Sequence, residues 1–190
     1  YYINAYYKYL LGWIDPVILT GKDAIKPMAL APVEPLENPD GLPRAAVLVP
    51  HRENIPLVEY YVAEYRAGGF DRATSPKSFF TQNPGVVIWH CDTAVDPLMH
   101  YTNSTSYLKP VHKSGAASYG AQDIYTAGDA FSQDTTPSST FYTGAHSGAF
   151  LKVDSLTPER ATLQIGLADP GPQIVISEYG STAIKRGQTW

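Results

Sequence analysis

The sequence contains a single cysteine, Cys91, so no disulfide can form within the chain. Charged residues are also scarce, at 17% of the chain, and the formal net charge is −4. A weakly acidic chain without a cluster of lysines and arginines gives no basis for nucleic-acid binding. No run of about 18 apolar residues is present, so the sequence predicts no membrane-spanning helix.

The motifs of common hydrolases and nucleotide-binding proteins are missing as well. The five histidines are His51, His90, His100, His112 and His146. No two of them lie four residues apart, which is the spacing that places both imidazoles of a His-Glu-x-x-His helix on one zinc ion. Ser147 lacks the Gly-x-Ser-x-Gly turn of a serine nucleophile, and no glycine-rich phosphate loop follows a strand. These residues therefore contain no complete active site of a familiar kind.

The chain is rich in tyrosine (14), proline (16) and glycine (15). Hydrophobic residues make up 44% of it. Tyrosine favours strands and bridges core and surface, whereas proline and glycine mark turns and loops. The composition of these 190 residues predicts a mainly β fold, an antiparallel or mixed sheet or sandwich with long loops. One amphipathic helix at the N-terminus completes the predicted fold.

That helix is predicted over residues 2–12. Its apolar stripe, expected to pack on the core, consists of Ile3, Tyr6, Tyr7, Leu10 and Leu11. Gly12 supplies the stop, and Pro16 prevents the helix from resuming. The chain opens on Tyr1 without an evident N-cap, so we expect residues 1–16 to continue from an upstream segment of a longer polypeptide.

Short runs of β-branched, aliphatic and aromatic residues between turn residues predict strands. We expect them at residues 17–20, 24–33, 45–49, 57–66, 85–91, 149–153, 161–167 and 174–177. Pro27 and Pro32 interrupt the second run and place it at a sheet edge. Residues 17–190 are predicted to form one β-rich domain, with a long irregular segment over residues 93–147 that is typically functional or held in place.

Two strands carry polar residues at a spacing of two, which puts both side chains on one face. His90 and Asp92 end the apolar run of residues 85–92, where they are candidates for a metal-binding or hydrogen-bonded pair or for a structural link. Glu64 and Arg66 form a second candidate pair, which could lock the sheet to a neighbour. Cys91 lies inside the same apolar run, which is typical of a small buried hydrophobe.

The irregular segment offers one candidate metal site. Asp123, Asp129 and Asp134 place three carboxylates among serine and threonine oxygens, a donor set that suits calcium, although the spacing matches no EF-hand. A solvated acidic loop is the alternative. Asn103 begins an Asn-x-Thr triplet, which is a glycosylation acceptor in a secreted protein.

Taken in order, several landmarks resemble immune inhibitor A-like secreted zinc metallopeptidases, in the part that follows the catalytic helix. The landmarks are Asn4–Pro16 with its Leu-Gly-Trp-Ile-Asp-Pro run, Glu59–Arg66, Gly69–Asp71, Gly85–Asp92, Gly128–Phe131, Thr136-Pro137 and Gly148–Val153. The resemblance covers about residues 4–165 and lies in the order of the motifs rather than in any single motif.

This resemblance implies a secreted, extracellular zinc endopeptidase acting on protein or peptide substrates. Its zinc ligands would lie on a His-Glu-x-x-His helix upstream of Tyr1, so no catalytic residue carries over to this chain. What carries over is a framework that consists of Trp13, Glu64, Arg66, His90 and Asp92. The expected function is support of a catalytic half, which is the implied partner.

Two alternatives remain open at this point. The first is a non-catalytic β-rich module that binds a surface or assembles into a homo-oligomer. The second is an independent hydrolase in which Cys91 acts with a nearby histidine. Such a cysteine would need an electropositive setting.

Overall fold

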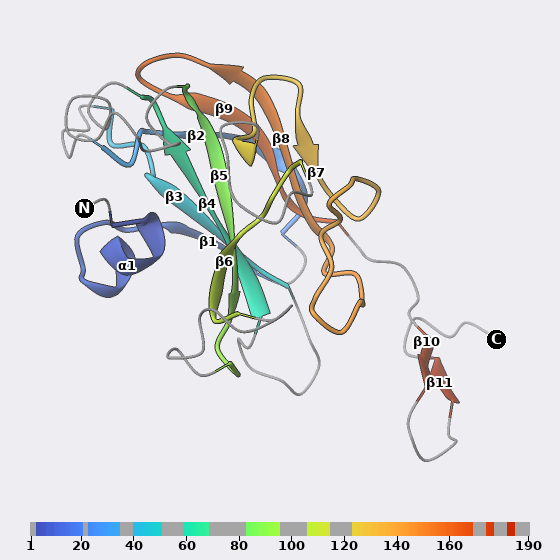
Figure 1. The fold of residues 1–190 in the computed structure, drawn as a ribbon. Coiled ribbons are helices and arrows are strands. Elements are labelled where there is room, and N and C mark those ends of the chain that lie inside the picture. Colours follow the sequence, from blue (N-terminus) through green and yellow to red (C-terminus); the bar gives the residue numbers. More distant parts are fainter. Residues whose placement is uncertain are drawn as a thin grey trace.

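The structure is a computed structural model, and it describes residues 3–20, 23–34, 40–50, 59–68, 83–95, 106–114, 123–168, 174–176 and 182–184. Two β-sheets pack face to face, and one short helix lies against the first sheet (Figure 1). The predicted fold class, mainly β with mixed and antiparallel sheets and one N-terminal helix, is confirmed.

The first sheet is mixed and has five strands. In spatial order they are β1 (Val17–Thr20), β3 (Ala45–Val49), β4 (Glu59–Arg66), β5 (Gly85–Asp92) and β6 (Leu108–Pro110). β1 runs parallel to β3, and the other neighbours pair antiparallel. β5 lies between β4 and β6, so the apolar run that ends in Asp92 is an inner strand, as predicted.

The second sheet is antiparallel. Its four strands, in spatial order, are β2 (Lys26–Leu30), β9 (Ala161–Leu167), β8 (Ala149–Leu156) and β7 (Ala130–Phe131). β2 is an edge strand, which is where a strand containing Pro27 was expected. A separate pair consists of β10 (Ile174–Ile176) and β11 (Thr182–Ile184).

β6 and β7 lie inside the segment predicted to be irregular. They contain three and two residues, which is too short for a repeating apolar pattern to identify them from sequence. β11 also lies in the stretch read as a polar tail. The segment is therefore held against both sheets rather than being wholly without regular structure.

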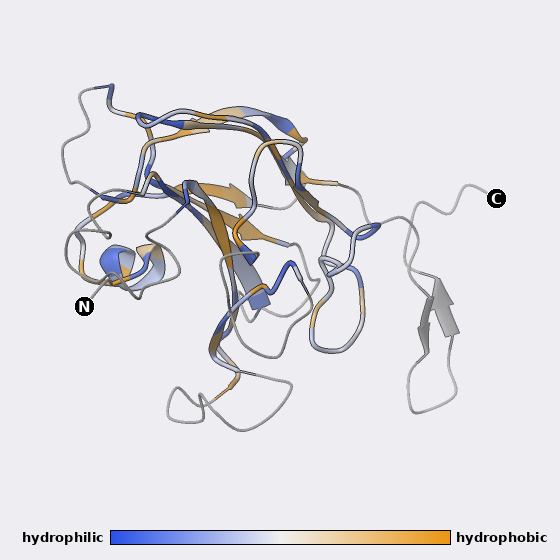
Figure 2. Ribbon diagram, turned by 45° about the horizontal axis from the view of Figure 1, so that its top comes forward, coloured by the Kyte–Doolittle hydropathy of each residue, from blue (hydrophilic) through white to orange (hydrophobic). Residues whose placement is uncertain are grey.

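The main core fills the space between the two sheets. Its largest buried side chains come from both sheets and from the connecting segments, and include Leu48, Tyr61, Tyr65, Ile88, Tyr125, Phe131, Leu151 and Leu163. We call the side of the first sheet that carries Leu48, Tyr61 and Ile88 its inner face. The central strands are coloured as hydrophobic along most of their length in Figure 2.

The opposite side of the first sheet, which we call the outer face, is also apolar. Val47, Val62 and Cys91 are buried there in a second cluster, which includes Ala5 and Tyr6 of the helix. An antiparallel sheet usually turns one polar face to water, whereas a sheet with two apolar faces needs a layer on each side. The helix supplies part of the second layer.

The helix α1 (Ala5–Leu10) is shorter than predicted, and Asn4 caps it by accepting a hydrogen bond from the Tyr7 N–H at 3.0 Å. The expectation of an uncapped start is therefore corrected. Its buried residues are Ala5, Tyr6 and Lys8. The prediction that the whole apolar stripe packs on the core is wrong, because three of its members are exposed, namely Tyr7, Leu10 and Leu11.

The end of α1 follows the sequence prediction. Gly12 has a φ of +70°, in the left-handed region that glycine adopts most readily. Its N–H donates to the Tyr9 carbonyl and that of Trp13 donates to the Lys8 carbonyl, so the helix closes with a Schellman motif.

Candidate functional site

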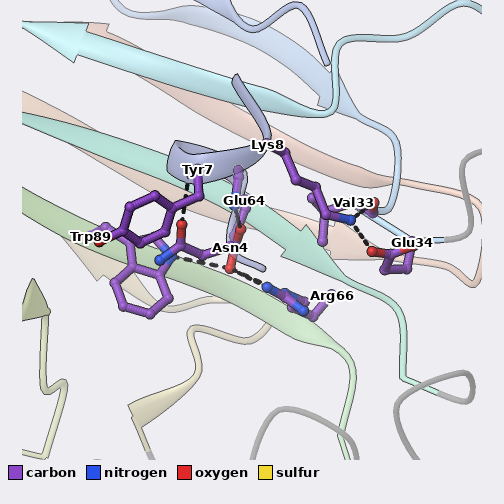
Figure 3. A network of polar contacts seen from close by, with 9 residues as sticks. Asn4, Tyr7, Lys8, Val33, Glu34, Glu64, Arg66 and Trp89 are labelled. Atoms are coloured by element: carbon purple, nitrogen blue, oxygen red, sulfur yellow. Dashed lines mark hydrogen bonds and ion pairs between the residues drawn. The ribbon is translucent and has the colours of Figure 1, made fainter. Parts of the chain in front are cut away.

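Glu64 on β4 connects the outer face of the sheet to α1. Its side chain is fully buried, and its Oε1 atom accepts hydrogen bonds from Arg66 Nε at 3.1 Å and from Trp89 Nε1 at 3.0 Å. Its Oε2 atom accepts a hydrogen bond from the N–H of Ala5, and Ala5 is the first residue of α1. Figure 3 shows Trp89 and Arg66 directed at the carboxylate of Glu64. Glu64 and Arg66, which the sequence places on one strand face, form an ion pair, and Glu64 also holds the helix.

The Ala5 contact has a simple electrostatic basis. The first N–H groups of a helix have no partner within the helix and carry partial positive charge, so a buried carboxylate stabilises them. The guanidinium of Arg66, with 3% of its side chain exposed, balances the charge of Glu64.

Lys8 provides the second attachment of α1. Its side chain is 2% exposed, and its Nζ atom donates to the Val33 carbonyl at 3.1 Å and to Glu34 Oε1 (Figure 3). A buried lysine needs such partners, since an isolated ammonium group in the interior would be strongly destabilising. The helix is therefore fixed by polar contacts at both its start and its middle.

Beside α1 the outer face is open and forms a pocket of about 400 Å³. Its floor is formed by Ile18 and Thr20 of β1, Val47 and Val49 of β3, and Val62 of β4. Its wall is formed by residues of α1 and by Pro16, among them Ala5, Tyr6, Tyr9 and Leu10. None of the described residues that line it is charged. A concave apolar pocket of this size is typical of a binding site.

Large apolar side chains are exposed next to the pocket. Leu10 is 60% exposed and Ile18 is 49% exposed, and both line it. Leu11 and Trp13, in the turn that ends α1, are 54% and 55% exposed. Scattered exposed leucines are normal in proteins, whereas exposed apolar residues gathered on one helix and the adjoining strand are less common.

His90 and Asp92 lie on the inner face, opposite to Glu64 and Arg66. His90 Nε2 lies 3.0 Å from Glu59 Oε1, and its ring is stacked between those of Tyr61 and Tyr142 at centroid distances of 4.6 and 4.3 Å. Glu59 Oε1 also accepts from the Tyr142 N–H at 2.6 Å. The histidine thus attaches the loop around Tyr142 to β4 and β5.

Asp92 has a local role. It is 8% exposed, and its Oδ1 atom accepts from the Ala94 N–H at 2.9 Å, which caps the turn after β5. The strand-end link that was one reading of the His90–Asp92 pair fits these contacts, with Glu59 rather than Asp92 as the partner of the histidine.

Cys91 is 1% exposed and faces the outer-face cluster. Burial raises the pKa of its thiol, which keeps the group protonated at neutral pH. A nucleophilic cysteine needs an accessible, electropositive setting that lowers the pKa. The surroundings of Cys91 are those of a packing residue.

The three aspartates of the predicted calcium site have separate partners. Asp123 is fully buried and accepts from the Ser114 N–H at 2.8 Å and from the Ser114 hydroxyl at 2.6 Å. Burial raises the pKa of Asp129, but the hydrogen bonds from Lys113 and Thr126 outweigh it, so the pKa lies below its ordinary value. Asp134 is exposed, and its N–H donates to the Ser132 hydroxyl.

Within the part of the chain that the structure describes, no group of three or more histidine, cysteine or acidic side chains is placed to hold a metal ion. The ammonium of Lys113 lies 2.6 Å from Asp129 Oδ2, where a cation would bind. Calcium at these aspartates remains a prediction. Asn103, His51 and His100 lie outside the described residues.

Sequence reasoning missed Lys8 and Glu59, which complete the two polar clusters. Lysine is seldom buried, and the two acceptors of Lys8 lie far from it in sequence, so no local pattern identifies its buried position. Glu59 lies on the face of β4 opposite to Glu64, and its pairing with His90 depends on the tertiary structure.

Among the residues described, no helix is long and apolar enough to cross a membrane. The chain was also compared with family models, with curated proteins and with solved structures, and no significant match was found in any of the three.

Proposed function

We propose that this chain is the non-catalytic, β-rich supporting part of a secreted zinc metalloendopeptidase. In this proposal the sandwich carries α1 in a fixed position, and α1 contacts a catalytic segment that lies outside these residues. The zinc ligands belong to that segment, because the described residues offer no set of ligands that fits a zinc ion. No catalytic step is assigned to this chain.

The observation that carries the proposal is the two-sided character of α1. One side is attached to the sheet through Glu64 and Lys8, which restrict its position and orientation. The other side exposes Leu10 and Leu11, apolar residues that a helix on the surface of an isolated domain would rarely present together. A helix that is fixed to the sheet on one side and apolar on the other suits a part that supports a second segment.

The sequence landmarks supply the identity of the partner. The exposed surface is formed by the first elements of the chain, and the family that the landmarks resemble has its zinc-binding helix upstream of the same position. The substrate class implied by that family is protein or peptide, and calcium at the acidic loop would be a structural ion in the same context.

The test is to isolate the polypeptide from its natural source and to sequence it by mass spectrometry, together with any chain that co-purifies. We expect a His-Glu-x-x-His segment in the same polypeptide or in a bound partner, and about one zinc ion per chain by elemental analysis. A particle without that segment and without zinc would refute the proposal.

The pocket favours a second candidate, a β-rich binding or assembly module without a catalytic partner. An uncharged pocket bordered by exposed leucine and isoleucine suits any apolar partner. An ordered multimer with no zinc would support this module and exclude the peptidase, so the same measurement separates the two.

A further inference from the structure

Tyrosine side chains and the cysteine meet on the outer face of the first sheet. The hydroxyl of Tyr6 on α1 forms a hydrogen bond with the hydroxyl of Tyr107, the residue that precedes β6. Tyr60 on β4 is hydrogen-bonded both to Tyr6 and to the thiol of Cys91. Phenols and thiols are readily oxidised side chains, and here they form one connected cluster.

The rings of Tyr6 and Tyr107 are in contact as well as their hydroxyls. Their centroids lie 5.9 Å apart and the ring planes cross at 74°. Tyr6 is 4% exposed, and Tyr107 packs against the same outer-face cluster, so neighbouring side chains restrict both rings. Groups that are already held in contact lose little further freedom when a bond forms between them.

The surroundings of Tyr6 favour loss of a hydrogen atom over ionisation. Burial, and then the hydrogen bond with Tyr107, raise the pKa of Tyr6, so its phenol stays protonated at neutral pH. A neutral phenol that loses an electron must also release its proton, and a hydroxyl oxygen in hydrogen-bond contact can accept it. Tyr107 provides such an oxygen.

Tyr7 connects this pair to the solvent. Its side chain is 39% exposed, and its ring centroid lies 5.2 Å from that of Tyr6. An oxidant in solution therefore reaches Tyr7 directly. Because aromatic rings in contact exchange electrons, oxidation at Tyr7 extends to the buried Tyr6.

From this geometry we propose that Tyr6 and Tyr107 are a site of oxidative phenol coupling, in which one covalent bond joins α1 to the segment before β6. The O–H bond of one tyrosine and a C–H bond ortho to the hydroxyl of the other break, and an ether bond forms between that oxygen and that carbon. The two electrons and two protons pass to a peroxide oxidant, so that hydrogen peroxide becomes two molecules of water. The inference does not depend on the proposed peptidase function.

The bond would stabilise a chain that cannot form a disulfide within itself. Tyr6 and Tyr107 are 101 positions apart in the sequence, and a crosslink that closes a long loop restricts the unfolded chain. Cys91 is the single cysteine, so no internal disulfide provides this restraint.

The test oxidises the full natural polypeptide with photoexcited tris(bipyridyl)ruthenium(II) and persulfate, which takes up the two electrons and becomes sulfate. Tyr6→Phe and Tyr107→Phe keep each ring and remove a hydroxyl. Tyr9→Phe is the matched control, because Tyr9 is an exposed tyrosine of the same helix. Mass spectrometry of the digested protein identifies bridged peptides, and urea unfolding measures stability.

We expect a bridge between Tyr6 and Tyr107 within one chain, with the loss of two hydrogen atoms, and a higher urea midpoint after oxidation. Tyr6→Phe and Tyr107→Phe should each abolish both changes, whereas Tyr9→Phe should retain them. Oxidised protein without this bridge, a bridge from Tyr6 to Tyr60 in its place, or a bridged protein with an unchanged midpoint would overturn the inference.

Discussion

At the scale of single residues, Glu64 has the most demanding environment in the described part of the outer face. It is 0% exposed, and its two oxygens accept bonds from a guanidinium, an indole and a helix N-terminus. A buried charge of this kind is stable only while every partner is present. The pairing with Arg66 followed from their spacing, whereas the contacts with Ala5 and Trp89 depend on the fold.

Replacing Glu64 by glutamine should destabilise the protein by about 3 kcal/mol, because the buried guanidinium of Arg66 loses the carboxylate that accepts from its Nε and Nη2 atoms. Urea unfolding followed by tryptophan fluorescence measures the change. The exposed Glu159→Gln is the control and should alter the unfolding free energy by less than about 0.5 kcal/mol. Equal effects of the two substitutions would mean that the Glu64 cluster does not stabilise the fold.

Tyr65 gives a prediction about pH. It is fully buried and its hydroxyl donates to the Thr157 carbonyl at 2.5 Å. Burial, and then the charge of Glu159, raise its pKa from 10.0 to about 12. The folded protein thus keeps a proton that the unfolded chain loses, so this contribution is complete below pH 10 and is lost as the pH rises to about 12.

The variant Tyr65→Phe should therefore show a shallower fall in unfolding free energy between pH 10 and pH 12 than the wild-type protein. Urea unfolding at a series of pH values measures this slope. Tyr9→Phe, which removes an exposed hydroxyl, controls for the loss of one tyrosine. A slope unchanged by Tyr65→Phe would contradict the prediction.

At the scale of elements, α1 shows where periodicity misleads. The repeat of apolar residues identified a helix and its stop at Gly12 correctly, but it assigned three exposed residues to the buried side. The sheet attaches the helix through Lys8 and the Ala5 N–H, so the apolar stripe turns partly outward. A stripe predicts that something apolar covers it, and does not say whether the cover belongs to the same chain.

This orientation can be measured. Tyr6→Ala should destabilise the chain by about 3 kcal/mol, since Tyr6 is 4% exposed and packs in the outer-face cluster. Leu11→Ala, at a residue of the same predicted stripe that is 54% exposed, should cost less than about 0.5 kcal/mol. Equally large losses for the two substitutions in urea unfolding would restore the stripe inferred from the sequence.

Gly166 in β9 is constrained by a close approach of the backbone, which the alternation of residues in the sequence does not show. A Cβ atom added at Gly166 would lie 2.7 Å from the backbone of residues 24 and 25, where the chain crosses the strand before β2. Backbone atoms cannot move aside as a flexible side chain can, so glycine is required there by close approach.

Gly166→Ala should therefore destabilise the protein by about 1–3 kcal/mol, the usual cost of overpacking. Gly12→Ala is the comparison, because Gly12 has open space around it and should show only the backbone cost of its positive φ, about 1 kcal/mol. Thermal unfolding by circular dichroism would compare them, and a Gly166→Ala variant as stable as the wild type would contradict the close approach.

At the scale of the whole molecule, one core joins both sheets. Leu163 of β9 and Tyr61 of β4 belong to the same buried cluster, and Tyr61 packs edge-on against Phe131 of β7 at 5.2 Å. Elements that share a core in this way unfold together. The five-stranded sheet also carries α1, so the position of the helix depends on the same cooperative unit.

Leu163→Ala should lower the unfolding free energy by about 2–5 kcal/mol, as for other large core deletions. Hydrogen exchange should then accelerate by a similar factor in β4 and in β8, although only the second sheet carries the substitution. Faster exchange confined to β8 and β9 would show that the two sheets unfold independently.

The sequence by itself determined the secondary structure of the longer strands, the edge position of the proline-containing strand and the Glu64–Arg66 pair. These features depend on periodicity, backbone chemistry and spacing within one element, which are local properties of the chain. Only the tertiary structure decided which faces are covered, which residues complete the polar clusters and where the pocket opens. Those features join residues far apart in sequence, such as Ala5 with Glu64 or Glu59 with Tyr142, and no local pattern carries that information.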